Sequence, residues 1–434
     1  MTINGQGGQF AVRPETALGT SAASWEDIYM EEMPQIPTTT MKLIANSIKG
    51  YRNPLSVGPP VAVDMAADSA FRLKTRIRRV VTNADAPILT YLMESMGWKE
   101  YASSASTVEA GATATSFTAV AIGQITVGKA IMVQLSIDGT TVYWPCLVAG
   151  VAGDTITPSI ALPIAPAEGA AIIPMDTYSP TSLTAQQVPT TKTLQFKLNS
   201  WRYFDDALGD GAIVLTGCAG SDLGAIELGA VGTVPMLDFG FHVSNASQLA
   251  DDIDADAFTD RDEFLVINDL FSFAFASTNS GSGIGTLVNK SITKVTINPG
   301  AKTIPVKAQG DRNSLGGNQA FVMQNEPATI AIEAHGTGDA AFDNEIFDQL
   351  AGTNDTKYIH CIQPTTSLDS PAFGIWLPCC RIAADGEPKR DDTGELPKFT
   401  VTYKADLSAW GGEESPDEMA ASPIYMAINN EAAA

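Results

Sequence analysis

Strict alternation of hydrophobic and polar residues is the clearest pattern along the chain, and it predicts strands. In residues 71–78, Phe71, Leu73 and Ile77 fall on one face of an extended segment, and four basic residues fall on the other. The 37 glycines and 25 prolines supply many turn signals between such runs. The pattern therefore predicts a mainly β protein built from many short strands.

A short amphipathic helix is predicted directly after this strand. Apolar residues recur at helical spacing from Ile88 to Met96, Asp85 and Pro87 favour a helix start, and Gly97 favours a stop. The second half repeats this order, with a strand pattern at 328–332 and a helical pattern at 342–350. Strand and helix thus occur twice in the same sequence order.

Two closing segments resemble each other more closely. Residues 213–218 end in Cys218 and residues 375–380 end in Cys380; a Gly-x-x-Pro turn follows each, ending at Pro235 or Pro397. A single offset, the one that takes Cys218 to Cys380, aligns all of these positions without a gap, and an alternating strand pattern follows each proline. Four elements in the same order predict an internal duplication, against the alternative that any two hairpins look alike.

The first copy carries an insertion. From the helix-stop glycine to the cysteine the first copy advances 121 positions (Gly97 to Cys218), whereas the second advances 28 (Gly352 to Cys380). Within the additional residues, 130–136 and 141–144 flank an Asp-Gly turn and predict a hairpin, with further short strands at 155–156 and 170–173. We expect a small β-barrel at about 117–185 that stands off the main body.

The predicted fold class is mainly β, with tandem β-sandwich domains, each flanked by one short helix, and an inserted barrel. The predicted organisation runs in chain order: an N-terminal arm (1–40), a first domain (41–250) with its insert, an acidic and Gly/Ser-containing linker (251–285), a second domain (286–410) and a C-terminal tail (411–434).

Charge narrows the possible functions. Asp and Glu number 49 against 26 Lys and Arg, so the net charge is −23. Such a field repels phosphates, which argues against a protein that grips nucleic acid. No leader-like segment and no run of about 20 apolar residues occurs, so we expect neither export nor a membrane span.

Few residues suggest catalysis. The five cysteines (146, 218, 361, 379 and 380) have neither metal-ligand nor disulfide-framework spacing, so buried reduced thiols are expected. The three histidines lack metal-ligand spacing, and no nucleotide-binding or hydrolase motif occurs. His360 precedes Cys361, but neighbouring strand residues point to opposite faces. We therefore expect a protein that is not an enzyme and needs no cofactor.

One acidic segment resembles a calcium loop. Residues 252–263 have acids at positions 1, 3, 5, 9 and 12 of a twelve-residue stretch, the pattern of an EF-hand. Position 6 is Ala257 instead of glycine, and a solvated acidic linker explains the same residues. The weak calcium candidates are Asp252, Asp254, Asp256, Asp260 and Glu263.

The basic stripe on the first strand has two interpretations. Arg72, Lys74, Arg76 and Arg78 could be a solvated face, or they could contact an acidic surface of another copy of this −23 chain. We favour the subunit contact.

Taken together, the chain resembles the major tail (tail tube) proteins of long-tailed, siphovirus-type bacteriophages. The resemblance lies in residues 292–407: strands at 292–297 and 304–307, a strand at 327–334, the helix at 342–350, then 373–377 and a hairpin at 394–403. The first copy shows the same order, interrupted by the insert. The matched features are order and spacing rather than a diagnostic motif.

The resemblance implies a virion protein that assembles with itself in the host cytoplasm into stacked rings. Members of that family form six-unit rings, so two units per chain imply three chains per pseudo-sixfold ring. Implied partners are other copies, the tape-measure, terminator and distal tail proteins, and genome DNA that passes through an acidic channel without sequence-specific binding. No membrane partner is implied.

Two other classes remain open. A capsid or decoration protein would share the acidic, β-rich composition and would form shells instead of tubes. A carbohydrate-binding or carbohydrate-cleaving β protein would need paired carboxylates or aromatic platforms, whereas the tryptophans are few and scattered.

Overall fold

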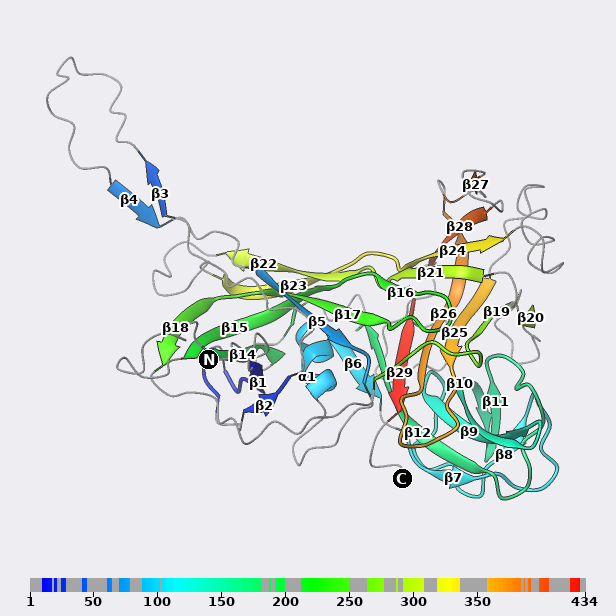
Figure 1. Ribbon diagram of the computed structural model, residues 1–434. Coiled ribbons are helices and arrows are strands. Elements are labelled where there is room, and N and C mark those ends of the chain that lie inside the picture. The colour runs from blue at the N-terminus through cyan, green and yellow to red at the C-terminus, as the bar shows by residue number, and fades with distance from the viewer. Residues whose placement is uncertain are drawn as a thin grey trace, which may run out of the picture.

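We describe the protein from a computed structural model. The residues it describes are 10–17, 19–21, 25–28, 41–44, 61–64, 70–78, 88–101, 103–180, 187–188, 192–199, 212–249, 264–276, 286–287, 292–307, 318–335, 357–383, 386, 389–391, 398–405 and 422–429. Within these residues the protein is mainly β, as predicted, with large antiparallel sheets and one α-helix, α1 (Ile88–Ser95) (Figure 1). No helix in this part of the chain is long and apolar enough to cross a bilayer.

A first group of strands forms a sheet in the order β2-β1-β14-β15-β17-β5. We call this group the first repeat. Its strands are β1 (Phe10–Pro14), β2 (Glu26–Asp27), β5 (Ala70–Arg76), β14 (Leu194–Asn199), β15 (Ala212–Leu223) and β17 (Met236–His242); β18 (Asn245–Leu249) also pairs with β15.

A second group repeats this order as β20-β19-β25-β26-β28-β24, and we call it the second repeat. Its strands are β19 (Ser272–Ala276), β20 (Thr286–Leu287), β24 (Thr329–His335), β25 (Lys357–Gln363), β26 (Phe373–Ile382) and β28 (Lys398–Ala405). Each strand of one group has a counterpart in the other at the same place in the sheet and in the same chain order.

The residue pairing also repeats. Ala219 lies opposite His242 between β15 and β17; the same offset leads to Arg381 and Lys404, which lie opposite each other between β26 and β28. An irregularity interrupts the β14–β15 ladder next to Cys218, and the β25–β26 ladder shifts at the corresponding Cys380. Because a one-residue slip would turn every side chain to the other face of the sheet, this agreement indicates that both repeats bury the same face.

Apolar residues on that face form one continuous core. In the first repeat four phenylalanines from four strands stack or meet edge to face, with ring centroids 4.8–6.3 Å apart: Phe10, Phe71, Phe196 and Phe241. In the second repeat, Phe273, Ile330, Ile359 and Tyr403 hold the corresponding positions, and all are buried. The core therefore runs through both repeats.

Helix α1 covers part of this core in the first repeat. Leu92, Met93 and Met96 are buried in it, and Thr90 hydrogen-bonds Tyr178 at 3.0 Å. The end of the helix lies against β15 at Gly220, where an added Cβ would come within 2.0 Å of the Met96 side chain. The close approach of helix and sheet therefore requires glycine there. The corresponding predicted helix at 342–350 lies outside the described residues.

The inserted segment forms a ring of paired strands in the order β7-β12-β9-β10-β11-β8, which an isolated bridge from Val108 to Ala119 closes. We call it the barrel. Its strands are β7 (Ser106–Thr107), β8 (Phe117–Thr118), β9 (Ala130–Ile137), β10 (Thr140–Ala152), β11 (Thr155–Pro158) and β12 (Ala171–Pro180). The predicted Asp-Gly hairpin joins β9 to β10, with Asp138 and Gly139 both at positive φ.

The barrel does not stand off the main body, in contrast to the expectation from the sequence. Its core is continuous with the outer face of the second repeat, where Tyr358, Ile362 and Trp376 are buried against it. Its strand β12 also pairs with β6 (Trp98–Tyr101) and with β29 (Tyr425–Asn429), which in turn pairs with β26. The barrel is therefore inserted into the chain within the first repeat, but it packs on the second repeat (Figure 1).

The structured units also begin earlier than predicted. Strand β1 lies in the segment expected to be an arm, and β19 lies in the segment expected to be a linker. Each pairs along its length with a long strand of its sheet, β14 or β25, and buries a phenylalanine, Phe10 or Phe273. Both segments are short and close to Gly- and Ser-rich stretches, so their local composition does not predict a strand. Their strand pairing is determined by residues far away in the sequence.

Removal of the Trp376 side chain tests how the barrel is held. Trp376 is fully buried at the contact between β26 and the barrel, so we expect Trp376→Ala to lower the free energy of unfolding by about 3–5 kcal/mol and to speed proteolysis of the barrel. Val231→Ala, at a side chain that is 69% exposed, is the control and should change little. A loss below about 1 kcal/mol in chemical denaturation would contradict this contact.

Candidate assembly interface

The two repeats meet edge to edge along one antiparallel strand pair, which we call the seam. On one side β15 continues into β16 (Ile226–Leu228), and on the other β21 (Ile292–Asn298) continues into β22 (Ala301–Lys307). Asp222 lies opposite Lys302, and Ile226 lies opposite Ile297. Strand β22 forms a hairpin with β23 (Asn318–Asn325), so a hairpin of the second repeat extends the sheet of the first.

A row of charged residues crosses the sheet at the seam. Arg72 on β5, Gly240 on β17, Asp222 on β15 and Lys302 on β22 lie opposite one another in turn. Arg72 forms ion pairs of 2.9 Å with Asp222 and with Asp238, and Lys302 forms an ion pair with Glu326. The charged members Arg72, Asp222 and Lys302 alternate in sign from β5 to β22, and Glu326, just after β23, pairs with Lys302.

Arg72 spans a neighbouring strand because Gly240 leaves room for it. A Cβ on Gly240 would come within 2.4 Å of the Asp222 carboxylate and 3.2 Å of the Arg72 guanidinium. Burial lowers the pKa of Arg72, but its hydrogen bonds with Asp238 and Asp222 and their charges more than offset this, so its pKa is raised. Since about two fifths of the Arg72 side chain is exposed, each ion pair stabilises the protein only modestly.

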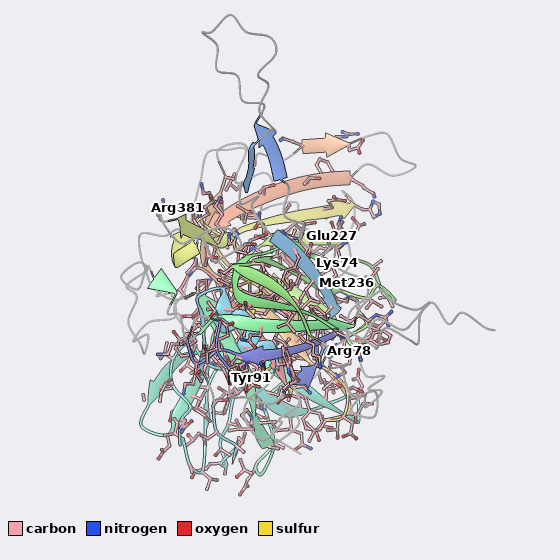
Figure 2. The ribbon with its side chains drawn as sticks, turned by 90° about the vertical axis from the view of Figure 1, so that its left-hand side faces the viewer. Lys74, Arg78, Tyr91, Glu227, Met236 and Arg381 are labelled. Atoms are coloured by element: carbon pink, nitrogen blue, oxygen red, sulfur yellow. The ribbon has the colours of Figure 1, made fainter. Side chains whose placement is uncertain are left out.

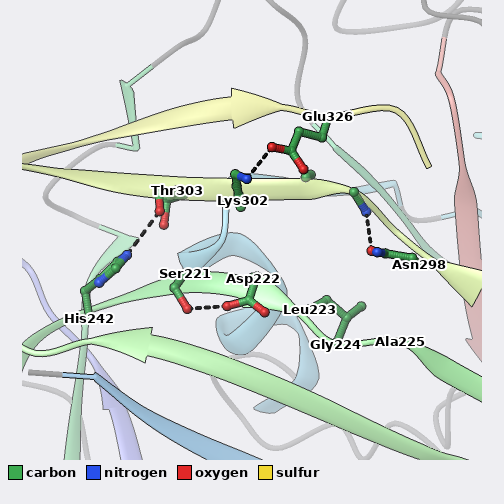
Figure 3. Close-up of a pocket in the computed structure, with 12 residues that line it drawn as sticks. Ser221, Asp222, Leu223, Gly224, Ala225, His242, Asn298, Lys302, Thr303 and Glu326 are labelled. Carbon is green, nitrogen blue, oxygen red and sulfur yellow. Dashed lines mark hydrogen bonds and ion pairs between the residues drawn. The ribbon is translucent and has the colours of Figure 1, made fainter. Parts of the chain in front are cut away.

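A groove of about 500 Å³ follows the seam and is polar (Figure 3). The Nε2 of His242 lies 3.1 Å from the Thr303 carbonyl oxygen, and the Thr303 hydroxyl donates to the carbonyl of Gly220. The contacts of Thr303 with His242 and with Gly220 join β22 to the first repeat. The other contacts drawn in Figure 3 (Ser221 with Asp222, Asn298 with Gly300, Lys302 with Glu326) lie within one side of the seam.

The predicted basic stripe divides into residues with different surroundings. Phe71, Leu73 and Ile77 are buried and Arg72 is exposed, so the strand turns the predicted faces inward and outward. Arg72 already forms ion pairs within the chain, and the Arg76 guanidinium lies 4.3 Å from the Phe264 ring centre. Figure 2 shows Lys74 and Arg78 on the same side of the molecule. That the stripe contacts another subunit stays a prediction.

The predicted calcium ligands, Asp252, Asp254, Asp256, Asp260 and Glu263, all lie outside the described residues. Among the residues that the structure does describe, no group of three or more His, Cys, Asp or Glu side chains could hold a metal ion. The acidic loop as a calcium site therefore stays a prediction.

The cysteines are free thiols, and four of the five are buried, with Cys379 partly exposed. Burial raises the pKa of the Cys146 thiol to about 12 and raises the pKa of Cys218, Cys361 and Cys380 as well. These four thiols stay protonated and poorly nucleophilic at neutral pH, as the sequence predicted for buried thiols.

His360 and Cys361 point to opposite faces, as expected for neighbouring strand residues. His360 lies opposite Trp376 and Ala274, which belong to the barrel-side core, whereas Cys361 lies opposite Ile375 and Phe273 in the main core. Burial lowers the pKa of His360 to about 3, so the folded protein holds it as neutral imidazole.

One signal of the interface was missed in the sequence. The stretches 50–55 and 310–315 share the pattern Gly-x-Arg-Asn-x-Leu, and the offset between them also aligns Lys42 with Lys302 and Ile44 with Ile304. This offset, before the insert, is larger than the one that takes Cys218 to Cys380 after it, so a single offset could not reveal both matches. Residues 301–307 and 318–325 form the hairpin at the seam, and 310–315 lies outside the described residues.

Comparison of the chain with models of known protein families and with curated protein sequences gives no match. Its function must therefore be argued from the fold and the seam.

His360 makes stability depend on pH. Its pKa is about 3 in the folded protein and about 6.5 when unfolded, so the unfolded state binds the additional proton as the pH falls below 6.5, and folding is weakened between pH 6.5 and 3. From pH 7 to 5.5 we expect the free energy of unfolding to fall by about 1 kcal/mol from this group. Urea denaturation of the wild type and of His360→Phe should give a smaller fall in the variant; equal slopes would contradict this assignment.

A side chain at Gly240 would crowd the ends of Ser221, Asp222 and Arg72. We expect Gly240→Ala to lower the free energy of unfolding by roughly 1–3 kcal/mol, because Ser221 and Asp222 must shift and the ion pair of Asp222 with Arg72 is disturbed. Gly150→Ala is the matched control, a strand glycine whose added Cβ would meet only an ordinary contact of 3.6 Å with Thr157. Thermal denaturation in which both variants lose equal stability would show that the crowding at Gly240 has no special effect.

Proposed function

We propose that the protein is a structural virion protein that assembles with itself into stacked rings, and that these rings form the tail tube of a long-tailed bacteriophage. The observation that carries the proposal is the seam. Two repeats with the same strand order and register are joined edge to edge, so one chain already contains two successive members of a head-to-tail series.

A head-to-tail contact uses two different surfaces, so it can be repeated without limit. If the rotation closes, the series forms a ring; otherwise it forms an open filament. Six repeats from three chains close the ring in this proposal. Strand edges that a monomer would have to protect from unwanted pairing are then paired with strands of neighbouring copies.

The charge of the chain supports passage of DNA through such a ring. With a net charge of −23, the assembly repels duplex DNA, which carries about one negative charge per 1.7 Å of its axis. At the seam, the outward-facing basic residue Arg72 is already neutralised by Asp222 and Asp238. A wall of this kind does not retain phosphates, so the genome can move through it without sticking.

The proposal predicts rings and tubes of the purified chain. At high protein concentration, negative-stain electron microscopy should show tubes or annular particles with a central hole, and native mass spectrometry should show multiples of three chains. Shells would instead support the capsid or decoration alternative. A strictly monomeric particle at all concentrations and salt conditions would contradict self-assembly.

A further inference from the structure

The hairpin β22–β23 of the second repeat pairs at both edges with strands that come earlier in the chain. Strand β22 meets β15 at the pair Asp222 and Lys302, and β23 pairs with β13 (Gln187–Val188) through Val322 opposite Gln187. We call this hairpin, residues 301–325, the second arm. It is the part of the second repeat that adds strands to the preceding sheet.

The first repeat has a corresponding hairpin, formed by β3 (Met41–Ile44) and β4 (Val61–Asp64). We call residues 41–64 the first arm. Each arm comes after the short second strand of its repeat and before the strand β5 or β24, although β21 also precedes the second arm. The arms are nearly equal in length and share the Gly-x-Arg-Asn-x-Leu pattern.

The two arms differ in what they contact. Among the described strands, β3 and β4 pair only with each other, whereas β22 and β23 are part of a ten-stranded sheet. Figure 1 shows β3 and β4 apart from the sheets, at the end of the molecule opposite to β26 and β28. The first arm is thus a hairpin like the one that extends the sheet at the seam, but among the described strands it extends no sheet.

The sheet edge that would receive such an arm recurs in the second repeat. In the first repeat, β14 pairs with β15 as far as Cys218, and β22 takes the same edge of β15 further along the strand. In the second repeat, β25 pairs with β26 as far as Cys380, and among the described strands none continues along that edge to Ile382. On the opposite edge of β26, Ile382 pairs with Tyr403 of β28.

We propose that the first arm of one chain adds to this edge of β26 in a second copy of the chain, in the register that β22 has on β15. This inference rests on the proposed self-assembly and assigns its contact. If the antiparallel register continues from the pair Lys302 and Asp222, Ile304 comes to the level of Gly220, in agreement with the hydrogen bond from the Thr303 hydroxyl to the Gly220 carbonyl. Ile44 is the counterpart of Ile304 and Ile382 is the counterpart of Gly220, so Ile44 of one chain is expected to lie opposite Ile382 of the next.

Net charge is compatible with a second copy as the occupant, because each arm carries three basic residues and one acidic residue, a net charge of +2, in a chain of net charge −23. At the receiving edge itself Arg381 lies opposite Lys404, so backbone hydrogen bonds of the added strands, and not local charge, supply affinity and register. Because arm and edge lie at opposite ends of the molecule, the contact is head to tail and continues from chain to chain.

Disulfide trapping tests the register. In a Cys379→Ser background, which removes the one partly exposed thiol, Ile44→Cys and Ile382→Cys are combined in one chain and oxidised with diamide under assembly conditions. We expect disulfide-linked dimers and trimers on a non-reducing denaturing gel. A mixture of the two single variants should give dimers only, because each chain then carries one half of the contact.

Two further variants are the controls. Asp222→Cys with Lys302→Cys should close a disulfide within one chain, which reports the register of the seam. Ile44→Cys with Met236→Cys, at an exposed residue on another strand, should cross-link roughly tenfold less or not at all, because only a held pair has a millimolar effective concentration.

The outcomes separate the inference from the function. Tubes that form without a cross-link between residues 44 and 382, or with that cross-link inside one chain only, would overturn the arm contact and leave the tube intact. Cross-linked trimers without tubes would support the arm contact and contradict the tube. The absence of any assembly would overturn both.

Discussion

Backbone hydrogen bonding across the seam is the interaction on which the rest of the arrangement depends. A strand edge presents unpaired N–H and C=O groups, and another strand edge satisfies them with a fixed register. At the seam, β15 and β16 of the first repeat pair with β22 and β21 of the second. The ion pairs and the groove come afterwards, because they join side chains that this register has already brought together.

The two repeats keep one face alike and have diverged on the other. The buried core face holds apolar residues in both, but the outer face differs because the barrel covers only the second repeat. Tyr358 and His360 on β25 correspond to Gln195 and Lys197 on β14. The outer face of the second repeat is therefore apolar because the barrel packs on it. The fold that the two repeats share does not depend on this apolar outer face.

Duplication within one chain also changes what an assembly can do. Identical units must use the same contact everywhere, whereas two repeats in one chain can make one contact internal and leave the other for a partner. Here the internal contact fixes the geometry of one junction, and the proposed contact between chains would reproduce it. In the proposed assembly, the −23 charge would act against retention of DNA.

The sequence by itself determined the local periodicities. The alternation at Phe71, Leu73 and Ile77 predicted the buried face of β5, the helical spacing at 88–96 predicted α1, and the Asp-Gly turn predicted the β9–β10 hairpin. Each of these depends on residues close together in the chain. The constant offset between the two copies also anticipated the matching register of the later strands, because equivalent residues occupy equivalent places in both sheets.

Only the tertiary structure decided which edges and faces meet. That β1 and β19 belong to the sheets, that the barrel packs on the second repeat, and that Arg72 reaches Asp222 over Gly240 all depend on residues far apart in sequence. Strand pairing is specified by burial and cross-strand packing, and short segments carry little of that information. Local sequence could therefore give the elements, whereas the seam required the whole chain to fold.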